Sequence, residues 1–370
     1  MKVTITGQDG FIGYHLYNHI KYKSKDLSLL DFQKNFFESK ENIDKIISQA
    51  DIIIHLAGLN RSNDDDFLYN QNLSLTNAII DSIKRVNFKG KLIFASSILE
   101  ESGTPYGHAK RKSRELFYSA SNKHEFSFSG LIIPNVFGPF CKPNYNSFVS
   151  TFCHNLIIKN ELIIKEDKEV KLIFINNLID EILNTINSKP SNNILIKEDS
   201  SSSVSDIKRK LENYFQLYLI NNQIPSLSSA FDKNLFLTLH SFIDIKTFFP
   251  KKNKLFKDQR GSFSEIIRSS SSGQSSFSIT KPGVTRGNHF HTRKIERFNV
   301  IKGKALIEVR KIGTELKSSF IISDEEPSFI DMKVWHTHNI KNIGKTDLIT
   351  FFWINEFYNE EDSDTFFEKV

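Results

Sequence analysis

The sequence predicts an α/β domain with a doubly wound parallel sheet, followed by an all-β domain that closes into a small barrel. Residues 2–6 alternate in polarity and run into a glycine turn and a helix, and strand and helix patterns alternate from there to about residue 138. From residue 260 onward, short alternating segments replace them without a helix-period segment of useful length. Because 370 residues are many for one core, we expect domains at residues 1–245 and 246–370.

Composition excludes several classes of protein. Hydrophobic residues make up 39% of the chain, and no apolar run approaches the roughly 18 residues of a membrane helix, so we expect no membrane partner. The net charge of +6 comes from lysines that are mixed with 43 acids, which argues against nucleic acid and suits small anionic substrates. Cys141 and Cys153 form no metal or disulfide pattern. The first residues do not resemble a signal peptide, and we expect a cytoplasmic protein.

The first strand leads into a glycine turn that is typical of a phosphate site. Gly7 would permit the tight turn, Gly10 the close approach of a phosphate, and Gly13 the packing of the helix on the strand. Phe11 and Ile12 begin the helix, over residues 11–22, and its unpaired N–H groups would face a pyrophosphate. We therefore predict a dinucleotide cofactor here.

An acidic residue follows the second strand, predicted at residues 27–30. Asp31 stands eighteen residues after Gly13, where a carboxylate accepts hydrogen bonds from an adenosine ribose. A carboxylate favours NAD because it repels the 2′-phosphate of NADP. Lys34, however, could bind that phosphate, so these residues are compatible with both NADPH and NADH.

The third strand, residues 51–58, is buried and ends where the cofactor would pass. Its last residues, Leu56, Ala57 and Gly58, would line the ribose and phosphates.

A serine, a tyrosine and a lysine follow in the order that ketone reduction requires. Ser97 ends the fourth strand, and a helix from residue 105 places Tyr106 and Lys110 one turn apart on the same face. Tyr106 would donate or accept the proton, Ser97 would hydrogen-bond the same substrate oxygen, and Lys110 would lower the phenol pKa and hold the nicotinamide ribose.

These residues together resemble the extended short-chain dehydrogenases/reductases over residues 1 to roughly 245. The resemblance implies a Rossmann-type domain that binds a nicotinamide cofactor. Dehydratases of that family carry an Asp-Glu pair beside the catalytic hydroxyl, whereas Ile98 and Leu99 follow Ser97 here. Simple keto reduction is therefore the better assignment.

Other segments receive coarser predictions. We expect a helix that begins within residues 141–147 and ends near residue 155, a polar linker or helix cap at 200–205, and a helix over 204–217. Loop-rich sequence follows to Pro250. Further on, residues 298–301 and 305–310 read as a β-hairpin.

Histidines in the second domain predict a metal centre. His289 and His291 are two residues apart on a strand and therefore share a face, while Glu296 returns on the neighbouring strand. His338 is the expected fourth ligand, with His336 as an alternative ligand or a candidate base. Such a set suits zinc, iron, manganese or nickel.

The spacing of this region resembles two cupin motifs, the first running from Gly283 to Gly303 and the second from His338 to Asn342. The cupin fold implies an all-β jelly-roll barrel whose metal is zinc or another divalent ion.

Both halves together resemble the CapF-type family of bifunctional capsular polysaccharide biosynthesis enzymes. The segments that carry the likeness are residues 60–61, 141–147, 260–263, 285–291, 355–356 and 364–367. The resemblance implies that the cupin epimerises C3 of a UDP-2-acetamido-4-keto-2,6-dideoxyhexose. The reductase then reduces C4 with NADPH to UDP-2-acetamido-2,6-dideoxy-L-talose, in UDP-N-acetyl-L-fucosamine biosynthesis for capsule or O-antigen. It also implies a homodimer.

Two alternatives stay open at this point. The chain could be a regulatory sensor that binds NAD(P), with a cupin that binds a sugar or a metal. It could also be an active reductase whose cupin is purely structural. Retention of Ser97, Tyr106 and Lys110 favours an enzyme, because a binding module has no need of a proton donor.

Overall fold

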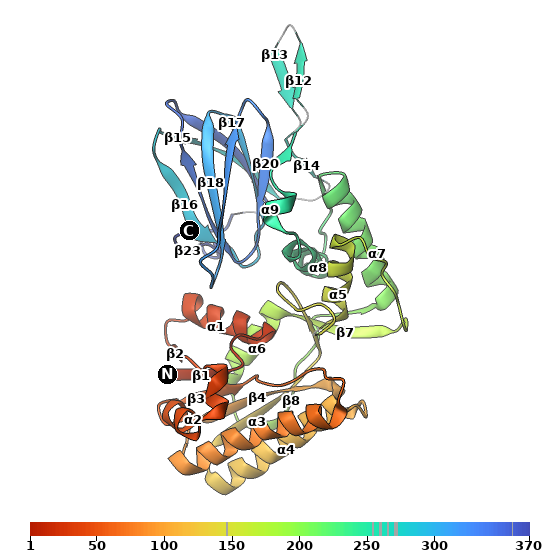
Figure 1. Ribbon diagram of the computed structural model, residues 1–370, viewed down its shortest axis with the longest axis vertical. Coiled ribbons are helices and arrows are strands. Elements are labelled where there is room, and N and C mark those ends of the chain that lie inside the picture. The colour runs from red at the N-terminus through yellow and green to blue at the C-terminus, as the bar shows by residue number, and fades with distance from the viewer. Residues whose placement is uncertain (146, 254, 259–260, 265, 270–272, 357) are drawn as a thin grey trace. The chain divides into compact units, whose positions relative to one another are not determined.

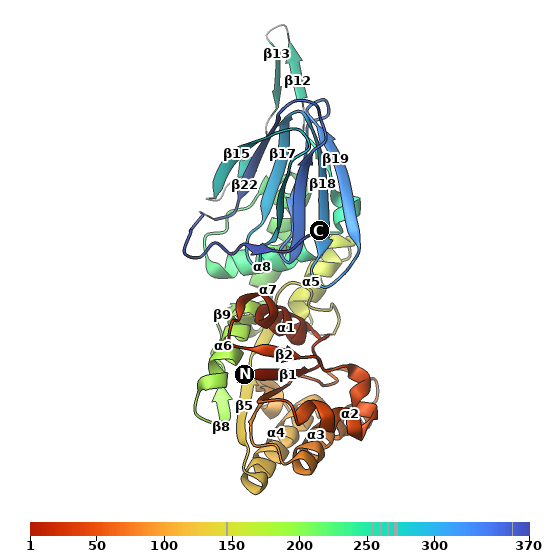
Figure 2. The same ribbon diagram turned by 90° about the vertical axis from the view of Figure 1, so that its left-hand side faces the viewer.

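The computed structural model describes residues 1–145, 147–253, 255–258, 261–264, 266–269, 273–356 and 358–370 (Figures 1 and 2). Contacts divide the chain into two compact units, Met1–Phe152 with Ile163–Ile207 and Cys153–Leu162 with Lys208–Val370. The predicted domains at residues 1–245 and 246–370 stay a prediction. Residues 146 and 260, from segments that carry the family resemblance, lie outside the described residues. No helix of the described chain is long and apolar enough to cross a bilayer.

The first unit is built on a parallel sheet with the strand order β2-β1-β3-β4-β5-β8. The strands are β1 (Lys2–Thr6), β2 (Ser28–Leu30), β3 (Ile52–His55), β4 (Lys91–Ser97), β5 (Ser127–Ile133) and β8 (Ser191–Leu195). Chain order reverses between β1 and β3, and ligands of such sheets bind beyond the carboxyl ends of the strands at that point. The predicted α/β class is confirmed.

Helices cover both faces of this sheet (Figure 1). One face carries α1 (Phe11–Lys23) and α6 (Ile175–Asn187), and the other carries α2 (Lys40–Ile47), α3 (Asp65–Val86) and α4 (Pro105–His124). Short 3-10 turns are η1 (Lys34–Glu38) and η2 (Ile98–Glu101). The core under α2, α3 and α4 is made of isoleucines and phenylalanines such as Ile53, Ile79, Phe94 and Phe117, which are all at most 2% exposed.

A small sheet with the order β6-β7-β9 follows, and it overturns part of one prediction. Its strands are β6 (Asn135–Phe137), β7 (Glu169–Phe174) and β9 (Ser200–Ser203). The four serines of β9 pair antiparallel with β7 and form no linker. Ser203 Oγ also accepts the N–H of Asp206 and thereby caps α7 (Val204–Tyr214). The helix predicted to begin within residues 141–147 begins later, as α5 (Phe148–Ile157).

Two antiparallel five-stranded sheets hold most of the strands of the second unit (Figure 2), and they confirm the prediction of an all-β domain in the last part of the chain. One sheet has the order β11-β20-β17-β22-β15 and the other β19-β18-β21-β16-β23. The strands are β11 (Lys251–Lys252), β15 (Gln274–Thr280), β16 (Thr285–Phe290), β17 (Glu296–Lys302), β18 (Lys304–Lys311), β19 (Lys317–Ser323), β20 (Ser328–Met332), β21 (His336–Asn342), β22 (Leu348–Ile354) and β23 (Phe366–Phe367). Two shorter pairs are β12 (Leu255–Asp258) with β13 (Gly261–Ser264), and β10 (Gln223–Ile224) with β14 (Arg268–Ser269).

The predicted hairpin across residues 298–310 is wrong. β17 pairs with β20 and β22, whereas β18 pairs with β19 and β21, so the two consecutive strands belong to different sheets. The chain crosses between the sheets at Gly303, whose φ of +97° is a conformation that glycine adopts without steric cost.

The prediction of loop-rich sequence before Pro250 is also wrong. Helix α8 (Ala230–Ser241) occupies this region, with the π-helix η3 (Phe215–Ile220) before it and the short α9 (Ile245–Phe248) after it. Ser229 and Asp232 form a capping box at the start of α8. The helix is apolar on several sides, with Leu235, Phe236 and Leu239 all buried, so it lacks the one-sided pattern that marks a surface helix.

Candidate functional site

The glycine turn between β1 and α1 has the geometry of a cofactor cradle. Gly7 has a φ of +76°, and the Gly10 N–H donates to the Gly7 carbonyl at 2.9 Å. A Cβ on Gly13 would lie 2.0 Å from that same oxygen, so only glycine fits there. Phe11 and Ile12 open α1 directly beside the turn. The open N–H groups of this helix start suit the pyrophosphate of a dinucleotide, as predicted.

The carboxyl end of β3 forms the other side of this candidate cofactor site. A Cβ on Gly7 would lie 2.8 Å from the Ala57 N, so the two turns are in close contact. The Ala57 N–H donates to Thr6 Oγ1 at 3.3 Å. Leu56 and Ala57 are half-buried and Gly58 is exposed, so the three predicted residues lie at the carboxyl end of β3 where the strand order reverses.

Asp31 follows β2, and its carboxylate already has a partner. Tyr17 on α1 donates its phenol O–H to Asp31 Oδ1 at 2.7 Å. Burial, together with this hydrogen bond, raises the pKa of Tyr17 to about 12. Sequence reasoning missed Tyr17, which has no signature apart from its place on the first helix.

Tyr106 and Lys110 lie one turn apart on the same face of α4. Lys110 Nζ donates to the Ala95 carbonyl at 2.8 Å and lies 5.7 Å from the centre of the Tyr106 ring. Burial and the nearby Tyr145 raise the pKa of Tyr106, which opposes the lowering expected from Lys110. The phenol therefore keeps its proton at neutral pH.

Burial lowers the pKa of Lys110 itself to about 8, although the Glu100 carboxylate opposes the shift. Ser97 is half-buried at the end of β4, and its Oγ accepts the N–H of Leu99 at 3.2 Å. Glu100 forms a buried ion pair with Arg114 at 2.6 Å, which fixes the turn after Ser97. Sequence reasoning missed this pair, because fourteen residues separate its members.

A cavity of about 660 Å³ opens beside Tyr106, lined also by Asn60, Arg61, Thr104 and Asn144. Its walls are rich in amides and hydroxyls, which suits a sugar. Tyr145 is a further residue that the sequence analysis did not single out, and its phenol oxygen accepts the Asn60 N–H at 3.2 Å.

The predicted metal ligands converge in the second unit. Ligand atoms of His289, His291, Glu296 and His338 all lie within 4.8 Å of one another. Glu296 Oε2 is 2.9 Å from His338 Nε2, 3.2 Å from His291 Nε2 and 3.7 Å from His289 Nε2. Three of the four residues are buried and His289 is half-buried. Three imidazoles around one carboxylate fit a divalent ion.

Backbone carbonyls fix the tautomers of two of these imidazoles. His291 donates its Nδ1–H to the Asp364 carbonyl at 2.6 Å, and His338 donates its own to the His336 carbonyl at 3.2 Å. Each Nε2 is therefore the nitrogen that is left to bind a metal ion. His291 Nε2 is buried and faces Glu296 Oε2 at 3.2 Å, which further supports a ligand role.

The pKa values in the cluster follow from burial and from the shared carboxylate. Burial alone would raise the pKa of Glu296, but the three neighbouring imidazoles outweigh it and hold the value well below its usual range. Burial likewise opposes a charge on His291, yet contact with Glu296 raises its pKa. Burial prevails at His338 and lowers its pKa.

His336 and Asn342 have other contacts. His336 does not belong to the converging group, and its Nδ1–H donates to the Val334 carbonyl at 2.9 Å. The Asn342 amide donates to the Thr280 and Thr346 carbonyls, both at 2.8 Å, and so holds two turns together. Asn342 thus stabilises the barrel end next to β21.

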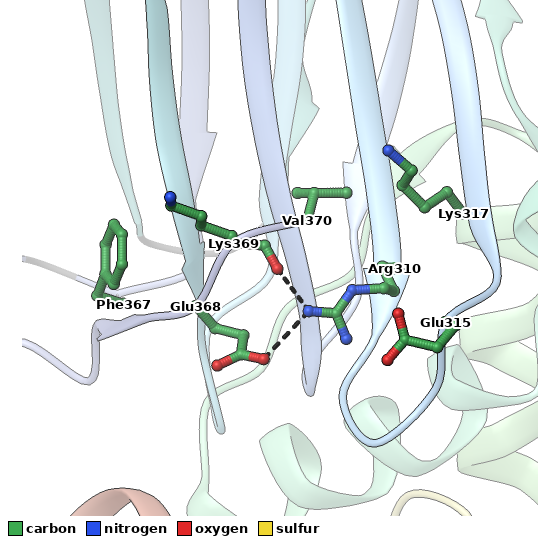
Figure 3. Close-up of a pocket in the computed structure, with 7 residues that line it drawn as sticks. All are labelled: Arg310, Glu315, Lys317, Phe367, Glu368, Lys369 and Val370. Carbon is green, nitrogen blue, oxygen red and sulfur yellow. Dashed lines mark hydrogen bonds and ion pairs between the residues drawn. The ribbon is translucent and has the colours of Figure 1, made fainter.

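A second cavity, of about 560 Å³, lies on the second unit (Figure 3). The close-up shows Arg310 beside Glu368 and Lys369, and its guanidinium donates to Glu368 Oε1 at 3.1 Å. Glu315 and Lys317 complete a wall of balanced charge. The Arg310 guanidinium already has these partners, so this cavity has no evident ligand.

Comparison with known proteins relates both units to sugar biosynthesis. Residues 3–180 match the NAD dependent epimerase/dehydratase family, and residues 256–366 match the polysaccharide biosynthesis C-terminal domain. The UDP-2-acetamido-2,6-beta-L-arabino-hexul-4-ose reductase of Pseudomonas aeruginosa is 31% identical over 372 residues, which cover 99% of this chain and 98% of that protein.

Solved structures agree with this relationship. The capsular polysaccharide assembling protein CapF from Staphylococcus aureus has 29% identity and a TM-score of 0.64, over 100% of both chains. RMD from Pseudomonas aeruginosa, solved with NADPH, shares the fold at 16% identity and a TM-score of 0.52, over 58% of this chain and 82% of that one. With its α/β unit, its β unit and its full-length match to a hexul-4-ose reductase, this chain belongs to the CapF family of capsular polysaccharide enzymes.

Proposed function

We propose that this chain is a bifunctional nucleotide-sugar enzyme of polysaccharide biosynthesis. Its cupin domain epimerises C3 of a UDP-2-acetamido-4-keto-2,6-dideoxyhexose, and its reductase domain reduces the C4 ketone to give UDP-2-acetamido-2,6-dideoxy-L-talose. The observation that carries this proposal is the full-length similarity to a UDP-hexul-4-ose reductase. The cavity beside Tyr106 and the histidine cluster around Glu296 support the two separate chemistries.

The reductase step relies on a protonated phenol. When bound in the glycine cradle, NADPH supplies the hydride for C4. Tyr106, whose pKa burial raises, keeps its proton at neutral pH and donates it to the oxygen of C4. Ser97 hydrogen-bonds the same oxygen, and the Lys110 ammonium adds positive charge beside the developing alkoxide.

The epimerase step has to come first. A proton on C3 is acidic only while C4 is a ketone, so reduction ends the chance of epimerisation. His289, His291, Glu296 and His338 would hold a divalent ion, for which we propose zinc. When bound, that ion supplies Lewis acidity or rigidity to the barrel.

We also propose a homodimer, as the family resemblance implies. β15 is the outermost strand of its sheet, and its outer face carries Phe277 and Ile279, which are 69% and 55% exposed. Apolar side chains on an edge strand favour contact with another chain.

The decisive experiment is an NADPH-oxidation assay with the UDP-4-keto-6-deoxy sugar in heavy water. Oxidation with deuterium at an inverted C3, detected by mass spectrometry and NMR, is the expected result. Oxidation without label or inversion at C3 would reduce the cupin to a structural role. Absence of oxidation with both NADPH and NADH would favour a sensor instead.

A matched pair of variants on α4 tests the proton donor. Tyr106→Phe should abolish NADPH oxidation, whereas Tyr118→Phe, on the same helix and 44% exposed, should leave the rate unchanged. Equal activity of both variants would remove Tyr106 from the mechanism.

A further inference from the structure

One buried carboxylate joins the metal-ligand loop to a distant part of the chain. Asp364 is 4% exposed, and its carboxylate accepts three hydrogen bonds from the two residues that follow His291. The Thr292 N–H donates at 3.1 Å, the Thr292 hydroxyl at 2.6 Å and the Arg293 N–H at 2.9 Å. The position of the loop after His291 is therefore set by Asp364.

The backbone of Asp364 acts on His291 directly. Its carbonyl accepts the Nδ1–H of His291 at 2.6 Å, which leaves the Nε2 lone pair directed at the cluster. Asp364 adopts a φ of +43°, a left-handed conformation that aspartate tolerates better than most residues. That backbone conformation and the three side-chain hydrogen bonds together aim the carbonyl at the imidazole.

His338 does not depend on this residue in the same way. His338 donates its Nδ1–H to the carbonyl of His336, within its own strand. The closing segment, which we define as residues 358–368, has further anchors that leave Asp364 out: Arg293 pairs with Asp362 at 2.8 Å, and Lys294 donates to the Ser363 carbonyl at 2.6 Å. Loss of the Asp364 carboxylate should therefore act mainly through His291 and leave the segment attached.

We propose that Asp364 is a positioning residue of the metal centre, which holds His291 in the tautomer and orientation that a metal ion requires. The inference rests on the proposed metal centre and extends it to a residue far along the chain. Partners of metal-binding histidines typically change metal affinity by about 10- to 100-fold when they are removed.

Zinc affinity of the full-length chain, measured by competition with a chromophoric chelator, tests the proposal. Asp364→Gly removes the carboxylate but keeps the left-handed backbone accessible, and it should weaken zinc binding by about 10- to 100-fold. Asp364→Asn keeps one acceptor oxygen and should weaken it less. The control, Asp362→Asn, breaks only the outer pair with Arg293 and should bind zinc like the parent. Equal zinc affinity of Asp364→Gly and the parent would overturn the proposal.

Two measurements keep the outcome unambiguous. If Asp364→Gly does not fold, Thr292→Val, which removes one of the three donors, should still weaken zinc binding several-fold. Unchanged zinc affinity of Thr292→Val would count against the positioning role of Asp364.

NMR of the histidine ring nitrogens in the metal-free chain should show His291 as the Nδ1–H tautomer in the parent and as a mixture of tautomers in Asp364→Gly. A parent chain that binds no zinc would refute the metal centre itself, a failure distinct from that of Asp364 alone.

Discussion

The charge on Lys110 should limit activity at alkaline pH. Burial lowers the Lys110 pKa from its ordinary 10.5 to about 8, so the ammonium loses its proton as pH rises through that value. The charged fraction then falls from about 90% at pH 7 to about 10% at pH 9, by the ordinary titration equation. If the ammonium holds the nicotinamide ribose, kcat/KM for NADPH should fall about tenfold over this range.

The assay is initial-rate NADPH oxidation between pH 6 and pH 10. kcat/KM for NADPH reports the ionisation of the free enzyme, to which the Lys110 value applies. Lys110→Arg should move the falling limb beyond the range, because a guanidinium keeps its charge there. Lys112→Met, an exposed change on the same helix, should leave the profile intact. A flat profile in the parent, or the same falling limb in Lys110→Arg, would refute the reasoning.

Three further changes test other features. Asp331→Ala should destabilise the second unit by about 3–5 kcal/mol in thermal unfolding. The reason is that the variant leaves the Arg297 guanidinium buried without the carboxylate that it contacts at 2.8 and 2.9 Å, and a loss of stability below about 1 kcal/mol would contradict the prediction. Glu296→Gln should remove tightly bound zinc, because a neutral amide replaces the carboxylate. Zinc content is measured by elemental analysis after gel filtration, and full zinc content in the variant would disprove the role of Glu296 as a ligand. Gly13→Ala places a methyl group 2.0 Å from the Gly7 oxygen and should abolish NADPH binding in a fluorescence titration, whereas unchanged affinity would argue against the cradle.

Local patterns explain which parts of the fold could be predicted. The strand, glycine turn and helix at the start of the chain depend on neighbouring residues, so the sequence was sufficient to predict them. The predicted hairpin was wrong because alternating polarity indicates a strand but not the strand with which it pairs. Here the chain passes from one sheet to the other at Gly303, between β17 and β18. The serines of β9 have little intrinsic strand preference, and pairing with β7 decides their conformation.

The candidate sites follow the same division. His289, His291 and Glu296 are close in sequence, so strand geometry alone places them together, and the structure brings them together with His338. Contacts between Asp364 and Thr292 span 72 residues, and no spacing rule reaches that far. The raised pKa of Tyr106 could not be predicted, because the sequence shows that Lys110 is near but not that the phenol is buried beside Tyr145.

The way the chain passes back and forth between the two sheets gives an ion in the barrel a mechanical role. Glu296 lies on β17 in one sheet, whereas His289 on β16 and His338 on β21 belong to the other. An ion shared by these ligands would fasten the two sheets together, and it would bind the folded chain only. Each tenfold rise in free ion above its dissociation constant would then add about 1.4 kcal/mol to the free energy of unfolding. The lifetime of the enzyme in the cell would accordingly follow the supply of the metal.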